Sequence, residues 1–375
     1  MTKPIVLLIL KALEGRGAER MVATLSRAYI EMNWEVHVLC LEDTKDMYLD
    51  PRVHYHVVPY NEPLLDTEME QAAAYKQVAE RIDNYVIKYI GLPDIILANI
   101  YKVNWIMAYS RLPNIINVLH TALSRQFEAR LKSTSNQITN HLKMVYGAHP
   151  CSCVSEGARQ DLLALIGDSD KVTTIYNPCD VRQIQQLASQ PFSLKEFGLI
   201  HKSYMIHVAS FDSMKGHRDL LHAYAKTAKK LPLVLVGKGR LEEEIKQLAH
   251  ELGINHCVKF LGFQSNPYPL IANAALLILS SKFEGFGYVI VEAQALKIPV
   301  ISTDCPFGPR ELLPQKNLVE VGDIDGLALL INNTVLYPEN YNVPLKQQLL
   351  PTYIAQQYLN FASVVKSNSS KKQSY

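Results

Sequence analysis

The sequence predicts an α/β protein of two doubly wound, Rossmann-like domains. Three observations support this prediction. The chain has 375 residues, which at roughly 150 residues per domain corresponds to about two domains. Short apolar runs alternate with amphipathic stretches, a pattern typical of βαβ units. The apolar runs are nearly continuous in Val, Ile and Leu, as expected for parallel strands that are buried on both faces.

Composition and charge indicate an ordinary globular protein. Hydrophobic residues make up 48% of the chain, charged residues 20%, and the formal net charge is +2, which gives no reason to expect a nucleic-acid binder. The apolar run Ile5–Leu10 is much shorter than the roughly 20 residues of a membrane span. It is also too short for a secretory signal. The six cysteines show no CxxC spacing, so we expect reduced thiols and a cytoplasmic location rather than a zinc site or disulfides.

The first predicted domain covers residues 1–180. A helix is expected after the turn Gly15–Gly17, where apolar residues recur at helical spacing, namely Met21, Val22, Leu25 and Tyr29. Seven runs in this half have the character of strands. They are Ile5–Leu10, Val36–Leu41, Val53–Val58, Ile95–Ile100, Ile115–Leu119, Cys151–Ser155 and Val172–Tyr176.

The second predicted domain covers residues 181–351 and repeats the same alternation. Its strand-like runs are Met205–Ala209, Leu233–Val236, Val258–Leu261, Leu276–Leu279 and Val300–Ser302. A helix over about 352–366 is expected to pack back onto the first domain. The Ser- and Lys-rich tail, residues 367–375, is expected to be disordered because it lacks apolar residues for burial.

The segment Ser280–Glu292 contains the richest candidate site. A predicted strand ends there, a loop with Glu284 follows, and a helix begins near Gly287. In an open parallel sheet, ligands bind beyond the carboxyl ends of the strands, and a helix N-terminus offers N–H groups to an anion such as a diphosphate. Carboxylates are natural acceptors for sugar hydroxyls. Either glutamate alone is more typical of a surface residue, but the whole segment favours a sugar-nucleotide site.

Three further loops contain candidate residues. Lys215 precedes a predicted helix and can pair with a phosphate. His120 ends a predicted strand, where it can bind a sugar hydroxyl or carry a proton. Arg310 lies in a loop rich in Pro and Gly, and it can bind phosphate or pair with Glu311 or another carboxylate. For each residue the alternative is an ordinary solvated or structural side chain.

The turn Gly15-Arg16-Gly17 follows the first predicted strand and superficially suggests a dinucleotide fingerprint. The third glycine of the GxGxxG pattern is replaced by Arg20, so a nicotinamide enzyme is disfavoured. A turn whose backbone faces a phosphate remains a sensible interpretation.

Together these segments resemble family 4 of the retaining glycosyltransferases, which have the GT-B fold of two Rossmann-like domains facing a central cleft. Glu284 and Glu292 are similar to that family's donor-binding motif, and Lys215-Gly216 to its donor-phosphate lysine. The resemblance covers about residues 4–313. Other segments that resemble the family are Val154–Gly157, Ile175–Pro178, Gly237–Gly239 and Phe260–Phe263.

The resemblance implies a role for each matched position. The catalytic candidates are Lys215 for the leaving phosphate, Glu284 for the transferred sugar, and His120 for the donor sugar or the chemistry. Glu292 would accept the ribose hydroxyls. Ser210 is a departure, because many members have arginine at this position. The remaining donor-binding candidates are Gly15, Arg16, Gly17, Ser210, Gly237, Phe263, Phe286, Gly287, Tyr288, Val289 and Arg310.

The resemblance further implies the reaction. A hexose or N-acetylhexosamine would move with retention from a nucleotide diphosphate sugar to a glycan or lipid-linked glycan. The resemblance favours UDP as the nucleotide of the donor. Such reactions build bacterial surface polysaccharide or lipopolysaccharide. No metal or other cofactor is expected, and no cluster of Asp, Glu and His in the sequence argues for one.

The stretch Arg125–Lys143 is the candidate for acceptor or membrane contact. It mixes cations with apolar residues, so it can lie on an anionic membrane face or form an ordinary solvated helix. The cations proposed for this contact are Arg125, Arg130, Lys132 and Lys143.

Two alternative functions stay open at this point. One is a GT-B nucleotide-sugar epimerase, which would turn over the donor without an acceptor. The other is a non-catalytic module that binds sugar nucleotides, against which the complete set of Lys215, Glu284 and Glu292 argues.

Overall fold

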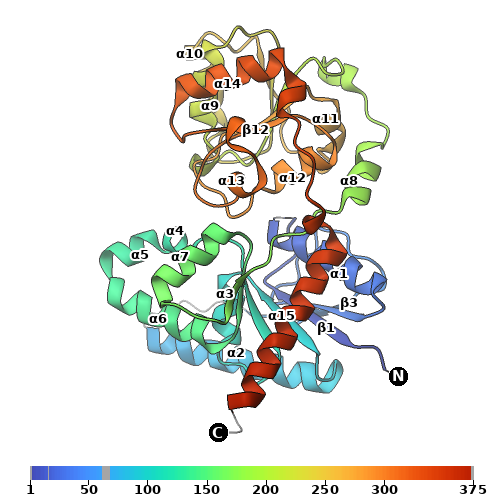
Figure 1. Ribbon diagram of the computed structural model, residues 1–375, viewed down its shortest axis with the longest axis vertical. Coiled ribbons are helices and arrows are strands. Elements are labelled where there is room, and N and C mark those ends of the chain that lie inside the picture. Colours follow the sequence, from blue (N-terminus) through green and yellow to red (C-terminus); the bar gives the residue numbers. More distant parts are fainter. Residues whose placement is uncertain (1, 16, 61–67, 373–375) are drawn as a thin grey trace. The chain divides into compact units, whose positions relative to one another are not determined.

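The computed structural model describes residues 2–15, 17–60 and 68–372 and divides the chain into two compact units (Figure 1). Unit 1 comprises Met1–Pro178 and Gln348–Tyr375, and unit 2 comprises Cys179–Gln347. The predicted boundary after residue 180 lies two residues beyond Pro178. Residues 348–351, which the sequence analysis assigns to the second domain, belong to unit 1.

Unit 1 is built around a parallel sheet whose seven described strands follow the order β3-β2-β1-β4-β5-β6-β7. The order reverses between β1 and β4, which is where ligands bind in open α/β sheets. The strands are β1 (Ile5–Leu10), β2 (Glu35–Cys40), β3 (His54–Val57), β4 (Ile95–Asn99), β5 (Ile115–Leu119), β6 (Cys151–Cys153) and β7 (Val172–Thr174).

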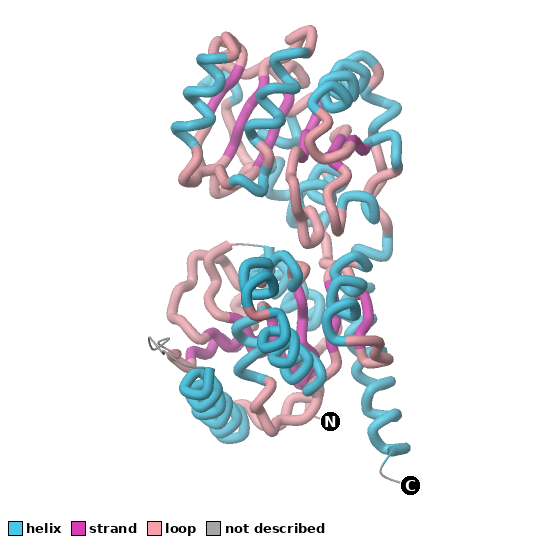
Figure 2. Tube along the Cα trace, turned by 90° about the vertical axis from the view of Figure 1, so that its left-hand side faces the viewer, coloured by secondary structure: helices cyan, strands magenta, loops and turns pink. Residues whose placement is uncertain are grey.

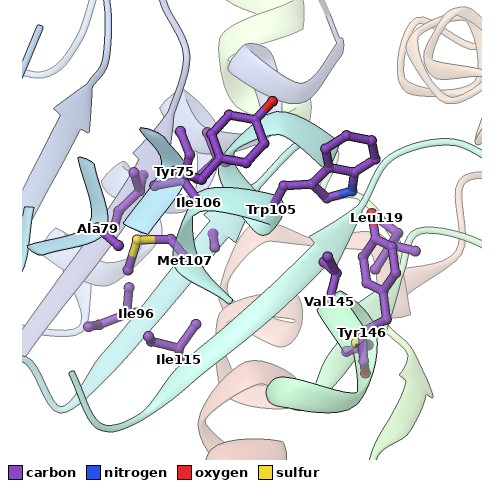
Figure 3. Packing of buried hydrophobic residues seen from close by; sticks show 14 of the residues in the cluster. Tyr75, Ala79, Ile96, Trp105, Ile106, Met107, Ile115, Leu119, Val145 and Tyr146 are labelled. Carbon is purple, nitrogen blue, oxygen red and sulfur yellow. Dashed lines mark hydrogen bonds between the residues drawn. The ribbon is translucent and has the colours of Figure 1, made fainter. Parts of the chain in front are cut away.

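Helices connect these strands and cover the sheet. They are α1 (Gly17–Glu31), α2 (Glu68–Tyr89), α3 (Tyr101–Met107), α4 (Leu123–Gln126), α5 (Glu128–Ser133), α6 (Ser135–Ala148) and α7 (Glu156–Ile166). On one face, Ile96 and Ile115 of neighbouring strands pack against Met107 of α3, and Tyr75 and Trp105 extend the same apolar cluster (Figure 3). The predicted apolar face of the first helix is buried, which confirms that prediction.

The last helix returns to unit 1. α15 (Pro351–Lys372) lies beside α1 (Figure 1), and Tyr358 is fully buried with its Oη 3.2 Å from Ser152 Oγ of β6. The helix continues through residues 367–372, where the sequence analysis expects disorder. The disorder predicted for this tail stays a prediction. Residues 373–375 lie outside the described residues.

Unit 2 repeats the architecture with six described parallel strands in the order β10-β9-β8-β11-β12-β13, and helices flank its sheet (Figure 2). The strands are β8 (Met205–Val208), β9 (Leu233–Val236), β10 (Val258–Phe260), β11 (Leu276–Leu279), β12 (Val300–Thr303) and β13 (Leu318–Val319). The helices are α8 (Val181–Ala188), α9 (His217–Lys226), α10 (Glu242–Glu251), α11 (Tyr268–Asn273), α12 (Tyr288–Ala295), α13 (Pro309–Leu312) and α14 (Ile324–Leu336).

The docking of α15 can be tested with two neighbouring residues. Ile354 is 0% exposed and Tyr353 is 45% exposed. We expect Ile354→Ala to lower the free energy of unfolding of unit 1 by about 2–5 kcal/mol, whereas Tyr353→Ala should change it by less than about 0.5 kcal/mol. Both tryptophans, Trp34 and Trp105, lie in unit 1, so tryptophan fluorescence during urea unfolding reports this unit. Equal effects of the two variants would contradict the docking.

Candidate active site

In unit 2, two loops meet where the strand order reverses. The loop after β8 contains Lys215, and the loop after β11 contains Glu284. Backbone and side-chain bonds join the loops, since the Lys282 N–H donates to Met214 O at 2.7 Å and the Ser280 hydroxyl donates to Lys215 O at 3.0 Å. The parallel pairing of β8 and β11 brings these distant segments to one sheet edge.

Gly216 permits this close approach. Its φ is 65°, in the left-handed region, and a Cβ atom added there would overlap the carbonyl oxygen of Ser280. Only glycine satisfies both constraints without strain. The residue therefore holds the preceding Lys215 against the end of β11.

Lys215 and Glu284 form the central ion pair of this edge. Lys215 Nζ lies 2.7 Å from Glu284 Oε1, and the side chains are 26% and 12% exposed. The Ser281 hydroxyl donates to the same carboxylate oxygen at 2.6 Å. The carboxylate is thus fixed from two sides, and it holds the ammonium group at the carboxyl edge of the sheet.

The pKa of Lys215 reflects two opposing influences. Burial lowers it, but the Glu284 carboxylate and, more weakly, Asp212 raise it, and the net pKa lies above the usual lysine value. The ammonium group is therefore charged at neutral pH. A partly buried positive charge at a sheet edge suits an anionic ligand.

Helix α12 begins beside this pair and contains the second predicted glutamate. Gly287 precedes the helix with φ 90°. Glu292, one turn further on, is only 4% exposed, and the Tyr268 hydroxyl donates to its Oε1 at 3.1 Å. Phe286 is buried, whereas Tyr288 and Val289 are half-buried at the helix start. The N-terminal N–H groups of α12 face the same edge as Lys215.

The other predicted donor residues of unit 2 occupy the neighbouring loops. The Ser210 hydroxyl donates to Asp212 Oδ2 at 2.5 Å. The Gly237 N–H donates to Gly262 O at 2.9 Å. Phe263 is 62% exposed, with Lys238 Nζ 4.9 Å from its ring centroid.

Arg310 makes a bidentate ion pair. Its Nε and Nη2 atoms lie 3.0 and 2.9 Å from the two oxygens of Asp304. Of the pairings predicted for Arg310, the structure shows the one with a carboxylate other than Glu311. A donor contact by Arg310 stays a prediction.

In unit 1, His120 follows β5 and is oriented by Asn99 at the end of β4. The Asn99 amide nitrogen donates to Ile9 O at 3.2 Å and to Leu97 O at 3.0 Å. Its Oδ1 atom, 3.0 Å from His120 Nε2, is therefore the acceptor. The network assigns the imidazole proton to Nε2 and leaves the lone pair on Nδ1. That buried Nδ1 atom has no hydrogen-bond partner among the residues that the structure describes.

Burial lowers the pKa of His120 to about 4, so the imidazole is neutral at physiological pH. The side chain lines a cavity of about 320 Å³ formed by the loops after β1, β4 and β5. Polar residues around the cavity include Lys11, Glu14, Glu19, Lys102 and Gln126. The unpartnered Nδ1 atom and this polar lining suit a ligand with hydroxyl groups.

The predicted glycine turn borders this cavity. Gly15 has φ 90° and Gly17 is the first residue of α1. The neighbouring residues Glu14 and Ala18 line the cavity itself. Arg16, also predicted to face the donor, lies outside the described residues.

The basic stretch spans the end of α4, all of α5 and most of α6. Arg125 and Lys132 both pair with Glu128, at 2.8 and 2.7 Å, which reduces the net positive charge on this face. Arg130 borders a second cavity of about 310 Å³ with Tyr101, Trp105 and Phe127 among its lining residues. Lys143 is exposed.

Within residues 2–15, 17–60 and 68–372, no helix combines the length and the hydropathy that crossing a bilayer requires.

One cluster of potential metal ligands is not predicted from the sequence. Glu35, His37 and His54 come together at one edge of unit 1 among the residues that the structure describes. The signal in the sequence is the alternation of polar residues in Glu35-Val-His37 and His54-Tyr-His56, which places each pair on one face of a strand.

Two family models match this chain. Residues 194–345 match glycosyl transferases group 1, and residues 15–183 match glycosyltransferase family 4. The chain belongs to these glycosyltransferases. The predicted family and the predicted enzyme class are thereby confirmed.

Named relatives of this glycosyltransferase act on bacterial glycans. This chain is 28% identical over 327 residues to the N-acetylgalactosamine-N,N'-diacetylbacillosaminyl-diphospho-undecaprenol 4-alpha-N-acetylgalactosaminyltransferase of Campylobacter jejuni. The match covers 80% of this chain and 81% of that protein. The chain is 29% identical over 189 residues to the lipopolysaccharide 1,6-galactosyltransferase of Salmonella typhimurium, covering 48% and 51%.

Solved structures share the fold of this glycosyltransferase. The crystal structure of Anabaena HepE in complex with UDP superposes with a TM-score of 0.71 at 20% identity, covering 98% of this chain and 100% of that one. This likeness confirms the predicted GT-B fold of two Rossmann-like domains.

The contact at Gly216 gives a stability prediction. Gly216→Ala should destabilise unit 2 by more than about 4 kcal/mol, because backbone must move. Gly253→Ala is the matched control, since Gly253 has φ 66° and nothing lies within 4 Å of an added Cβ. That variant should lose only about 1–2 kcal/mol. Amide hydrogen exchange of peptides from β8 and β11 measures both losses, and equal losses would contradict the close approach.

The ion pair gives an electrostatic prediction. Glu284→Gln keeps the side-chain shape but removes the charge that raises the pKa of Lys215. Burial then dominates, so the pKa of Lys215 should fall below that in the wild type. The pH dependence of Lys215 acetylation, followed by mass spectrometry, measures this shift. Lys316, an exposed lysine of unit 2, serves as the internal control. An unchanged Lys215 profile would refute the coupling.

Proposed function

We propose that this glycosyltransferase moves a hexose or N-acetylhexosamine, with retention, from a UDP-linked donor to a glycan or lipid-linked glycan acceptor. The product would belong to a surface polysaccharide or a lipopolysaccharide. The observation that carries the proposal is the Lys215–Glu284 ion pair beside the N-terminus of α12.

The Lys215 ammonium and the N-terminus of α12 supply the positive charge that stabilises a diphosphate leaving group. Breaking the bond between the sugar and the donor phosphate leaves negative charge on the phosphate. The ammonium of Lys215 and the N–H groups at the start of α12 are fixed donors that stabilise this charge as it develops. Glu284 orients the lysine and offers its carboxylate to the hydroxyls of the transferred sugar. The proposed transfer uses no cofactor, because these residues supply the neutralisation.

Glu292 is assigned to the nucleoside. Its carboxylate is buried on the first turns of α12, and the Tyr268 hydroxyl donates to one of its oxygens. A carboxylate has about four lone-pair positions, so it can also accept bonds from both ribose hydroxyls.

His120 is assigned to a sugar hydroxyl in unit 1. With a pKa of about 4, the imidazole is too weak a base to hold a proton at neutral pH. Its Nδ1 lone pair accepts a hydrogen bond instead, because Asn99 fixes the proton on Nε2. Of the two predicted roles of His120, sugar binding is therefore favoured over proton transfer.

The relatives support the choice of donor and acceptor. The Campylobacter protein is named for a diphospho-undecaprenol acceptor, the Salmonella protein for lipopolysaccharide, and the Anabaena structure contains UDP. For this chain we propose peripheral contact with the cytoplasmic membrane face through Arg130 and Lys143. Arg125 and Lys132 contribute less to the attraction because Glu128 partly neutralises them.

The experiment measures donor binding and turnover with UDP-, GDP- and ADP-sugars, and NMR identifies the anomer of the product. Lys215→Ala should lower kcat/KM at least about 100-fold, the usual cost of removing a group that stabilises the transition-state charge. Glu292→Gln should weaken UDP binding at least about tenfold, because it removes charge-assisted hydrogen bonds to the ribose.

Two exposed residues of unit 2 supply matched controls, Lys316→Ala and Glu251→Gln. Both should behave like the wild type within about twofold. Full turnover by Lys215→Ala, or an inverted product, would overturn the proposal. Conversion of the donor to an epimer without any acceptor would instead support the alternative epimerase.

A further inference from the structure

A second cluster of functional side chains lies at the edge of the unit 1 sheet. The edge strand β3 pairs in parallel with β2, and the register places His54 beside His37. Side chains two positions apart share one face of a strand. Glu35 and His37 of β2 therefore lie on the same face as His54 and His56 of β3.

These side chains are in direct contact. His37 Nε2 lies 3.1 Å from Glu35 Oε1, and His54 Nε2 lies 3.9 Å from the same oxygen. The rings of His37 and His54 stack with centroids 4.8 Å apart. One ligand atom from each of Glu35, His37 and His54 lies within 4.8 Å of the others.

The cluster is anchored on one side and open on the other. The His37 side chain is 5% exposed, whereas those of Glu35 and His54 are 40% and 57% exposed. His56 Nε2 lies 2.9 Å from His37 Nδ1, and His56 Nδ1 lies 3.0 Å from the Tyr85 hydroxyl of α2. An ion can enter from solvent while the buried ligand stays fixed.

We propose that Glu35, His37 and His54 bind one divalent transition-metal ion of the Zn²⁺ class. Two imidazole nitrogens and one carboxylate oxygen are a ligand set that Zn²⁺ accepts, and Ca²⁺ or Mg²⁺ would prefer oxygen alone. The single carboxylate offsets half of the ion's charge. A water molecule would complete a four-coordinate shell.

The distances fit this ion after a small movement. Bonds of about 2.0–2.2 Å to tetrahedral zinc place ligand atoms roughly 3.3 Å apart. His37 and Glu35 already meet this spacing at 3.1 Å. Only the exposed His54 must approach, since its Nε2 lies 3.9 Å from Glu35 Oε1 and the three ligand atoms lie within 4.8 Å of one another. Its position on an edge strand allows that rotation.

Metal binding to His37 requires no loss of a proton from the histidine rings. When the metal takes the lone pair of His37 Nε2, the imidazole keeps its proton on Nδ1 and donates it to His56 Nε2. His56 then keeps its own proton on Nδ1 and donates it to the Tyr85 oxygen. Each ring retains one proton, so the change is a shift of tautomers. Hydrogen bonds of this kind typically orient a metal-bound histidine.

The proposed ion has a structural consequence. Among the described strands, β3 pairs only with β2, so its attachment to the sheet is one-sided. A metal bound by residues of both strands cross-links them. Because the ligands are assembled only in the folded unit, the ion should raise the stability of unit 1 by mass action.

The test uses the full chain without a histidine tag. Calorimetry with Zn²⁺ should give one ion per chain, and Mg²⁺ should give no binding. His54→Ala and Glu35→Gln should each weaken Zn²⁺ binding at least tenfold. His256→Ala removes an exposed histidine of unit 2 and should leave the affinity unchanged. Zn²⁺ should also raise the midpoint of unfolding followed by tryptophan fluorescence in the wild type, but not in the two ligand variants.

Co²⁺ supplies a readout that does not depend on the variants. Bound Co²⁺ should show the visible absorption of a nitrogen- and oxygen-ligated site without a thiolate charge-transfer band. A thiolate band, no cobalt spectrum, or Zn²⁺ affinity that is equal in the wild type and in His54→Ala would each overturn the proposal.

Discussion

The candidate active site of unit 2 depends on the close approach of two loops at the point where the strand order reverses. Gly216 lies against the carbonyl of Ser280, and no larger residue fits there without moving backbone. This contact fixes the position of Lys215, whose ammonium reaches Glu284 at 2.7 Å. The backbone contact thus supports an electrostatic one, because Glu284 raises the pKa of Lys215 against the lowering effect of burial.

The two units share a sheet topology but place different side chains at the point where the strand order reverses. In unit 2, the strand-order reversal gathers a charged lysine, a carboxylate and a helix N-terminus, which suit an anionic group. In unit 1, the corresponding edge presents a neutral histidine whose tautomer Asn99 determines. Burial produces the neutrality of His120, whereas the ion pair preserves the charge of Lys215. In the proposed function, the edge of unit 2 recognises negative charge and the edge of unit 1 recognises hydroxyl groups.

The sequence predicts the strands of the two sheets better than it predicts the contacts between distant side chains. Runs such as Ile5–Leu10 and Leu276–Leu279 match their strands, because parallel strands buried on both faces are continuously apolar. The strand Leu318–Val319 is too short to give a pattern. The Lys215–Glu284 pairing joins residues 69 positions apart, and the tautomer of His120 depends on Asn99. Contacts between such distant residues depend on the order and register of the strands. Neither can be read directly from a single sequence.

The most direct test is a double-mutant cycle on UDP binding, measured by calorimetry with the wild type, Lys215→Ala, Glu284→Gln and the double variant. If Glu284 acts by holding Lys215, its replacement should weaken UDP binding only while the lysine is present. The two effects should then deviate from additivity by more than about 0.5 kcal/mol. Strictly additive effects would contradict the central claim that the ion pair works as one unit in recognising the diphosphate.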